Sequence, residues 1–403
     1  MGQTYSAHHL AQLRAGRGAV LDGDGALVVL KALLQSGVAY LGGYPGAPTS
    51  SLIDAMASAY EPVLKPLGIY FEASGSEANA AALLAASVNH PVRGAVNWKV
   101  VGTNVAADAL AHVAHAGVTG GALVIVGEDY GCNSTLVAET TLPYAIKSTM
   151  VLLDPKGDLQ HLADLVEHAF AISEASQMPA MLLLRTRVGN LRGRIRCKDN
   201  VPPPVSTLRP LERLTADPAR LPLPPQTFAQ ERAKAERRLP AARAYARRHR
   251  LNELRPGADA AFGIISHGML LNTTLRCLYL MGEADLRGAS RIPILNLHLL
   301  HPLDPEELAG FMRDKRAVLV VEEGLPALLE EQVRAAAQRA GLGTAIFGKE
   351  LLSAAGEYTP ELVLRGLAGF LAEVERRQVA VPAPAGAPLV AEPAGVGAGG
   401  ARP

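Results

Sequence analysis

The chain has 403 residues, of which 49% are hydrophobic and only 4% aromatic, and its formal net charge is +1. This length predicts two or three domains, and the near-zero charge gives no overall field that would attract nucleic acid. The N-terminal segment lacks the apolar core of a secretion signal and no apolar run is long enough to span a bilayer, so we expect a cytoplasmic protein without a nucleic-acid or membrane partner.

Short apolar runs alternate with amphipathic segments in residues 1–198. Such alternation predicts a doubly wound parallel sheet, which we assign to a first α/β domain spanning this range. The predicted strands are 38–43, 68–72, 94–98, 122–127, 149–153 and 180–185, and the predicted helices are 25–36, 52–60, 76–88, 104–115 and 159–174.

Residues 199–258 differ in composition and are predicted to form a linker. The segment begins with a proline-rich stretch and continues into a helical stretch rich in arginine. Tyr245 is the one aromatic residue among residues 232–250, whereas single-stranded nucleic acids are usually bound by stacking on aromatic rings. We therefore favour a solvated linker helix that packs against another subunit.

Residues 259–377 form a second predicted α/β unit. Strands are expected at 261–266, 292–297, 317–322 and 343–347, and helices at 270–281, 305–312, within 323–339, and at 360–376. The tail, residues 378–403, is rich in Pro, Ala and Gly, and is predicted to be disordered.

The segment Gly42–Ser51, with the sequence Gly-Gly-Tyr-Pro-Gly-Ala-Pro-Thr-Ser-Ser, is the first candidate site. It follows a predicted strand and precedes a predicted helix, the setting in which backbone N–H groups face a ligand. Thr49, Ser50 and Ser51 are suitable N-cap residues for that helix.

Glu77 is the second candidate. It lies in the first turn of a predicted helix whose other residues are small and apolar, so its carboxylate is expected to point into an apolar interior or an interface and to need a partner. A purely structural glutamate, stabilised by the helix dipole, is an equally good interpretation at this point.

Other motifs are interpreted as structural. Asp22–Gly25 resembles the start of a thiamine diphosphate–magnesium motif, but we interpret it as a turn before a helix because the required Asn ligand is missing. His267, His298 and His301 have no metal-ligand spacing and are interpreted as turn or interface histidines. The three cysteines, Cys132, Cys197 and Cys277, are too few for an iron–sulfur cluster, which needs about four thiolates, and Cys132 is interpreted as a loop thiol.

Several segments together resemble the alpha subunit of 2-oxoacid:ferredoxin oxidoreductases, and within that family the indolepyruvate enzymes. The resemblance covers roughly residues 20 to 375 and is carried most specifically by the Tyr-Pro-Gly-x-Pro turn and the later Gly-x-Asn-Val-Ala-Ala-Asp run. The matching segments are Gly43–Pro48, Glu72–Glu77, Trp98–Asp108, Gly117–Gly131, Arg185–Val188 and Val320–Glu323.

The resemblance implies a pyrimidine-type thiamine diphosphate-binding domain followed by a transketolase C-terminal-like α/β domain. The catalytic glutamate of the family maps onto Glu77, where it would hydrogen-bond to the N1′ atom of the aminopyrimidine ring. Pro45 and Gly46, with Asn104 as a weaker candidate, would contact the cofactor, and Tyr44 and Ala47 would lie on the substrate side. No residue of this chain is expected to bind metal.

The implied reaction is the oxidative decarboxylation of an aryl 2-oxo acid such as indolepyruvate to the acyl-CoA, with electrons passing to ferredoxin or another iron–sulfur partner. The diphosphate-binding and iron–sulfur regions of the family are missing from this sequence. We therefore expect activity only with partner chains that hold Mg²⁺ and the clusters and share the thiamine diphosphate.

Two departures from the family pattern keep alternatives open. Ala47 replaces a Thr or Ser, and Leu136–Thr141 replaces a polar run. A phenylglyoxylate-type or other 2-oxo acid oxidoreductase subunit, a non-oxidative thiamine-dependent decarboxylase subunit and a non-catalytic scaffold subunit are the alternatives.

Overall fold

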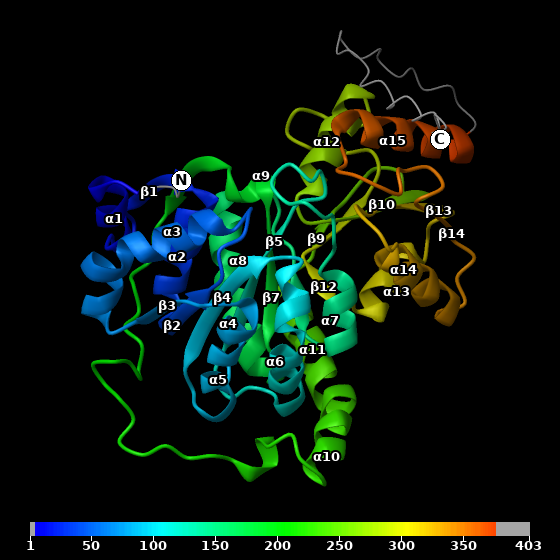
Figure 1. Cartoon of the computed structure of the whole chain (residues 1–403). Coiled ribbons are helices and arrows are strands. Elements are labelled where there is room, and N and C mark those ends of the chain that lie inside the picture. Colours follow the sequence, from blue (N-terminus) through cyan, green and yellow to red (C-terminus); the bar gives the residue numbers. More distant parts are fainter. Residues whose placement is uncertain (1–4, 376–403) are drawn as a thin grey trace, which may run out of the picture.

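The computed structural model describes residues 5–375, so the predicted disorder of the tail lies outside the described residues. Two sheets, each flanked by helices, make up most of the described chain (Figure 1). This arrangement confirms the predicted α/β class with parallel sheets.

The first sheet has seven strands in the order β12-β6-β7-β5-β4-β2-β3. All its neighbours pair in parallel except β12, which is antiparallel to β6. Every residue of β2, β5 and β7 is buried, as expected for strands covered on both faces. The strands are β2 (Val38–Gly43), β3 (Tyr70–Ala73), β4 (Arg93–Lys99), β5 (Ala122–Glu128), β6 (Val151–Leu153), β7 (Ala180–Arg185) and β12 (Leu299–His301).

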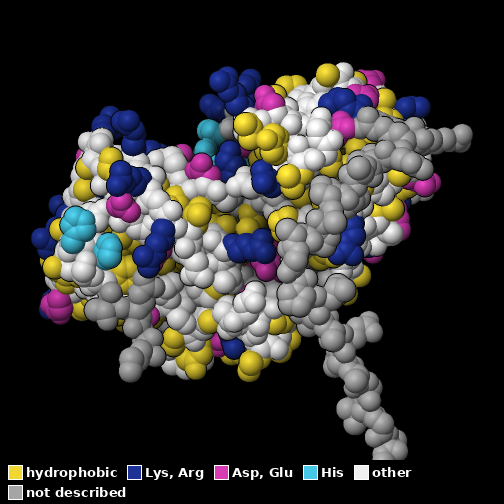
Figure 2. All heavy atoms as spheres, turned by 90° about the horizontal axis from the view of Figure 1, so that it is seen from above, with side chains coloured by type: hydrophobic (Ala, Val, Ile, Leu, Met, Phe, Trp, Pro, Cys, Tyr) yellow, Lys and Arg dark blue, Asp and Glu magenta, His cyan; other side chains and the backbone are white. Residues whose placement is uncertain are grey.

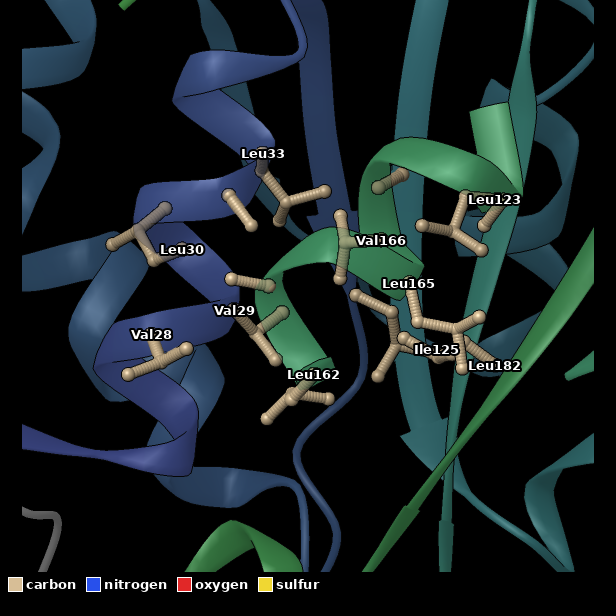
Figure 3. Packing of buried hydrophobic residues seen from close by; sticks show 14 of the residues in the cluster. Val28, Val29, Leu30, Leu33, Leu123, Ile125, Leu162, Leu165, Val166 and Leu182 are labelled. Atoms are coloured by element: carbon tan, nitrogen blue, oxygen red, sulfur yellow. The ribbon is translucent and has the colours of Figure 1, made fainter. Parts of the chain in front are cut away.

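Helices cover both faces of this sheet. On one face, α2 (Gly25–Gln35) and α8 (Leu159–Ser176) pack side by side and interdigitate their aliphatic side chains with those of β5 and β7 (Figure 3). Each fully buried Leu or Val contributes about 1.5–3 kcal/mol. The other helices of this unit are α1 (Ala7–Leu13), α3 (Ser50–Ala59), α4 (Glu77–Leu83), α5 (Ala86–Asn89), α6 (Gly102–Ala116), α7 (Leu142–Ser148) and α9 (Thr186–Gly189).

The second sheet has five strands in the order β14-β13-β10-β11-β9, and only the edge strand β9 is antiparallel. Its strands are β9 (Glu253–Arg255), β10 (Phe262–His267), β11 (Ile294–Leu297), β13 (Ala317–Val321) and β14 (Ala345–Phe347). Its helices are α12 (Leu270–Leu280), α13 (Pro305–Met312), α14 (Leu328–Arg339) and α15 (Pro360–Glu375).

Two short strands pair outside the predicted segment from which they come. The short strand β12 comes from the second unit but pairs with the first sheet, and β9 comes from the segment predicted as linker but pairs with the second sheet. The sequence predicted neither strand, because both pair antiparallel at the edge of a sheet outside the regular alternation of strand and helix. The predicted domain boundaries at residues 198 and 258 therefore stay a prediction.

The linker contains helical segments that pack on the first unit of the same chain. They are η3 (Pro218–Arg220), α10 (Gln226–Ala233), η4 (Lys234–Arg238) and α11 (Leu239–His249). Helix α11 packs against α8 through the buried side chains of Ala242 and Ala246. The predicted packing of the linker against another subunit stays a prediction.

The predicted turn at Asp22–Gly25 is wrong. Val20–Asp24 forms strand β1, which pairs antiparallel with β8 (Arg192–Arg196). Asp24 ends the strand and caps α2 by accepting a hydrogen bond from the backbone N–H of Leu27 (2.9 Å). Within residues 5–375, no helix has the length and apolar composition needed to cross a membrane.

Candidate functional site

The candidate site lies where β2, β3 and β4 end. Because these strands are parallel, their carboxyl ends meet at one edge of the sheet, the upper edge in Figure 1. Ser74 N–H donates to the Gly43 carbonyl (2.8 Å), and Tyr44 N–H donates to the Asn97 carbonyl (3.0 Å). Three turns that are far apart in the sequence are thereby held together. Figure 2, viewed from above, shows this face with basic, acidic and hydrophobic side chains interspersed.

The turn after β2 is pressed tightly against β4. A Cβ on Gly43 would lie 2.5 Å from Asn97 Oδ1, and one on Gly46 would lie 2.9 Å from Lys99 Cγ. The side chain of Asn97 also donates to the Thr49 carbonyl (3.3 Å). Only glycine therefore allows the turn to approach β4 so closely.

Thr49 occupies the N-cap position of α3 but does not cap it with its side chain. Its hydroxyl donates instead to the Gly46 carbonyl (3.0 Å), which closes the turn on itself. The side chain therefore stabilises the shape of the turn rather than the helix end.

Glu77 is the first residue of α4 and is only 6% exposed. Its carboxyl group packs against the start of α6, since a Cβ on Gly102 would lie 2.8 Å from Glu77 Cδ. No hydrogen bond or ion pair joins this carboxylate to another residue in the described part of the chain. A glutamate that is so little exposed and has no protein partner favours a ligand that donates a hydrogen bond or carries positive charge.

The structure brings the turn residues and Glu77 to neighbouring loops of one edge. Tyr44, Gly46 and Ala47 are half-buried, and Pro45 is exposed on the same turn. The turn is thus partly accessible at this edge of the sheet, and the predicted roles of its residues toward cofactor and substrate stay predictions.

Asn104 lies elsewhere. It follows Gly102 by two residues on α6, and so projects from a different side of that helix, about 200° around the axis. Its side-chain nitrogen donates to both carboxylate oxygens of Glu139 (3.2 and 3.0 Å), at a groove of about 370 Å³ that also includes Tyr144 and Pro326. The structure does not bring Asn104 against the Glu77 carboxylate.

A buried ionic cluster, which the sequence analysis missed, joins the two units. Arg185 Nη2 lies 2.8 Å from Asp154 Oδ2, and Arg185 Nη1 lies 2.5 Å from Glu323 Oε2. His267 Nδ1 lies 2.7 Å from the same Asp154 oxygen. All four residues are less than a tenth exposed. The signal in the sequence was a charged residue or a histidine at the end of several apolar strands.

Burial and neighbouring charges shift the pKa values of the carboxyl groups in this region. Desolvation raises the pKa of Glu128, although Arg185 opposes the shift. Burial likewise raises the pKa of Glu322, although hydrogen bonds from the backbone N–H groups of Glu330 and Leu329 oppose this shift. For Asp154, burial is outweighed by Arg185 and His267, so its pKa is lowered.

His267 and His298 lie at the contact between the two units, in agreement with the predicted interface positions. His267 contacts Asp154, and His298 Nδ1 lies 2.9 Å from the Asp154 carbonyl oxygen, so both bridge the two units. His301 lies in β12, which crosses between them. Among residues 5–375, no group of His, Cys, Asp and Glu side chains could hold a metal ion. Cys132 is exposed in the loop after β5, as predicted.

Comparisons with known proteins confirm the resemblance predicted from the motifs. No family model matches the chain. It is 29% identical over 375 residues to the indolepyruvate oxidoreductase subunit IorA of Methanothermobacter marburgensis, covering 92% of this chain and 58% of that protein. It is 28% identical over 344 residues to the protein of the same name from Thermococcus kodakarensis, covering 85% of this chain and 51% of that protein.

A solved structure shares the fold. The 2-oxoglutarate:ferredoxin oxidoreductase from Magnetococcus marinus, solved with 2-oxoglutarate, coenzyme A and succinyl-CoA bound, matches with a TM-score of 0.65 at 15% identity. The match covers 86% of this chain and 64% of that one. The chain thus spans a little over half the length of the curated relatives it matches.

Proposed function

We propose that this chain is a subunit of a thiamine diphosphate-dependent 2-oxoacid oxidoreductase and supplies the part of the active site that holds the aminopyrimidine ring. The observation that carries this proposal is the buried Glu77 carboxylate at the carboxyl edge of a parallel sheet. Glu77 has no hydrogen-bond or ion-pair partner for its carboxylate within residues 5–375. The curated relatives are named as subunits of an indolepyruvate oxidoreductase.

The residues present fit the aminopyrimidine ring of this cofactor. A pyrimidine ring nitrogen can share a proton with the Glu77 carboxyl group, as the acceptor when Glu77 is protonated or as the donor when the ring is protonated. Gly102 leaves room for the Glu77 side chain at the start of α6.

When bound, thiamine diphosphate would supply a carbanion to add to the 2-oxo carbon and a cationic ring to take up the electron pair left behind as CO₂ departs. The role of Glu77 is to hold a proton at its carboxylate, shared with the ring nitrogen N1′. The small apolar residues of α4 exclude water around Glu77, which strengthens that hydrogen bond. Tyr44 to Ala47 would form the wall on the substrate side.

The substrate that we propose is an aryl 2-oxo acid such as indolepyruvate, converted to its acyl-CoA. The names of the relatives support this choice, and the methyl side chain of Ala47 leaves space for a bulky substituent. The two electrons would pass through iron–sulfur clusters to ferredoxin or a similar acceptor.

Partner chains would complete the active site. Three cysteines are too few for a cluster, so we propose that an iron–sulfur subunit and a diphosphate-binding subunit, which also holds Mg²⁺, assemble with this chain. The relatives extend well beyond the matched region, which is consistent with the missing functions residing outside it.

Capture of the tagged chain from its native host tests this assembly. The copurified material is analysed for thiamine diphosphate and iron. Both are expected with a partner chain, and a chain that copurifies with neither would count against the proposal.

Glu77→Gln in the reconstituted complex tests the mechanism. Turnover with indolepyruvate is expected to fall by about 10² or more, because the amide cannot hold the shared proton. The matched control is Glu61→Gln, which removes an exposed carboxylate that pairs with Lys65, and should leave turnover unchanged. If Glu77→Gln were as active as the control, the chain would be a scaffold subunit.

A further inference from the structure

The C-terminal end of α6 holds a deeply buried arginine from the linker. Arg238 is 7% exposed, and its two terminal nitrogens donate to the carbonyls of Ala114, His115 and Ala116 (3.0–3.2 Å). Gly117 makes room for the guanidinium, because a Cβ there would lie 2.6 Å from Arg238 Cζ. One function of Arg238 is therefore to cap the negative end of the α6 dipole.

That cap leaves positive charge uncompensated. In residues 5–375, Arg238 makes no ion pair with a carboxylate, and its Nε is buried without a hydrogen-bond partner. Burial, together with the neighbouring charges of Arg220 and Arg237, lowers the pKa of Arg238 to about 10. A buried cation beside two more cations is unfavourable unless an anion joins them.

The acidic residues nearby do not balance this charge. Asp217 lies 3.7 Å from Arg220, and Glu231 is shared between Lys234 (3.9 Å) and His115 (3.7 Å). Arg237 has no ion pair among the residues that the structure describes. Three arginines and a lysine thus face two carboxylates.

The arginines line a pocket of about 240 Å³ between α6, η3 and α10, at the lower end of the molecule in Figure 1. Gln177 and Gln226 also line it, as does Asp217, the partner of Arg220. Gln230 lines it too, but its side-chain nitrogen already donates to the carbonyls of Ala219 and Leu221. The guanidinium groups of Arg220 and Arg237 line this cavity, and Arg237 has no ion pair among the described residues. Such groups suit a phosphate, whose oxygens accept several hydrogen bonds.

We propose that this pocket binds the phosphate group of a small phosphorylated metabolite, with Arg220 and Arg237 as its ligands and Arg238 as the buried charge behind them. The site is separate from the one proposed around Glu77. Helix α6 has 15 residues and runs from Gly102, beside Glu77, to Ala116, so the two sites lie about 22 Å apart along it.

Titration calorimetry of the full chain with inorganic phosphate, at constant ionic strength set with chloride, tests the proposal. One site with millimolar or tighter affinity is expected. Arg237→Gln should weaken binding about tenfold, because it removes a charge-assisted contact from an exposed position where folding does not depend on it. Arg220→Gln should weaken it similarly. The matched control is Arg232→Gln in α10, whose side chain pairs with Glu236 and should not affect binding.

Glycerol phosphate, titrated in parallel, separates a phosphate ester from free phosphate. Tighter binding of the ester supports a metabolite, and equal binding of the two probes supports phosphate alone. Hydrogen exchange should show phosphate protecting residues 226–249. The proposal is overturned if millimolar phosphate produces no binding, or if the Arg237 and Arg232 variants bind equally well. Neither result would bear on Glu77, because no turnover is measured.

Discussion

At Glu77, the local structure and the tertiary structure act on the same carboxylate in opposite ways. As the first residue of α4, Glu77 interacts favourably with the positive end of the helix dipole. Its burial beside Gly102, without a partner among residues 5–375, costs part of that gain. Such a balance is typical of residues kept for function rather than stability.

Gly102→Ala should therefore separate activity from stability. The added methyl group would displace the Glu77 carboxyl group, so turnover of the reconstituted complex should fall at least tenfold. The free energy of unfolding should change by less than about 1 kcal/mol, because alanine stabilises a helix relative to glycine by up to that amount. Enzyme assay and urea unfolding of the same samples measure the two effects.

Gly310→Ala is the control for that substitution. Gly310 lies within α13, and a Cβ there has no neighbouring atom within 4 Å. Both activity and fold should be retained, with stability unchanged or raised by up to about 1 kcal/mol. A Gly102→Ala protein as active as Gly310→Ala would show that Glu77 need not keep its position.

Among the elements, β12 links the two units through only three residues. It leaves the second unit, pairs antiparallel with β6 and brings His301 into the first sheet. His301 is buried, and neither ring nitrogen has a hydrogen-bond partner among the described residues. Burial, together with the charge of Arg243, lowers the pKa of His301 to about 4.

His301 should make stability depend on pH in a defined window. Its pKa is about 6.5 in the unfolded chain and about 4 in the folded one, so below pH 6.5 the unfolded state binds more protons. Stability is therefore complete above pH 6.5 and decreases as the pH falls toward 4. His301→Leu should reduce this loss by up to about 1.4 kcal/mol per pH unit, measured by urea unfolding between pH 7 and about 4.5.

The control is His112→Leu, since the His112 side chain is 60% exposed on α6. Its pH dependence should match that of the unmodified chain. If His301→Leu behaved in the same way, another group would have to cause the acid sensitivity, such as His161, whose pKa burial lowers to about 3.

At the scale of the whole molecule, the two sheets meet through charge as well as through apolar packing. The carboxyl ends of β7 and β10 face each other, and Arg185 from the first unit lies between Asp154 and Glu323. In such a site the attraction between opposite charges offsets a large desolvation cost, so each charge depends on the others.

Arg185→Gln should destabilise the chain strongly. Removal of the cation leaves Asp154 and Glu323 buried without their main partner, at a cost of about 3–5 kcal/mol in the free energy of unfolding. The matched control, Arg187→Gln, breaks a partly exposed pair with Glu357 and should cost about 1 kcal/mol or less. Equal losses in the two variants, measured by urea unfolding, would mean that the buried cluster contributes little.

The sequence by itself determined the fold class and most of the longer elements. The strands Val38–Gly43 and Ala180–Arg185 and the helix Pro305–Met312 were predicted with their observed bounds, because their periodicity or apolar run is local and complete. The motifs also indicated Glu77 and the turn at Tyr44–Ala47, since residue type and spacing are properties of the sequence.

Only the tertiary structure decided which of these residues meet. It placed Asn104 beside Glu139 rather than against Glu77, and it moved β12 into the first sheet. It also assembled Arg185, Asp154, His267 and Glu323 from two units, and Arg220, Arg237 and Arg238 around the end of α6. These clusters depend on contacts between distant segments, whose register and burial no local pattern specifies.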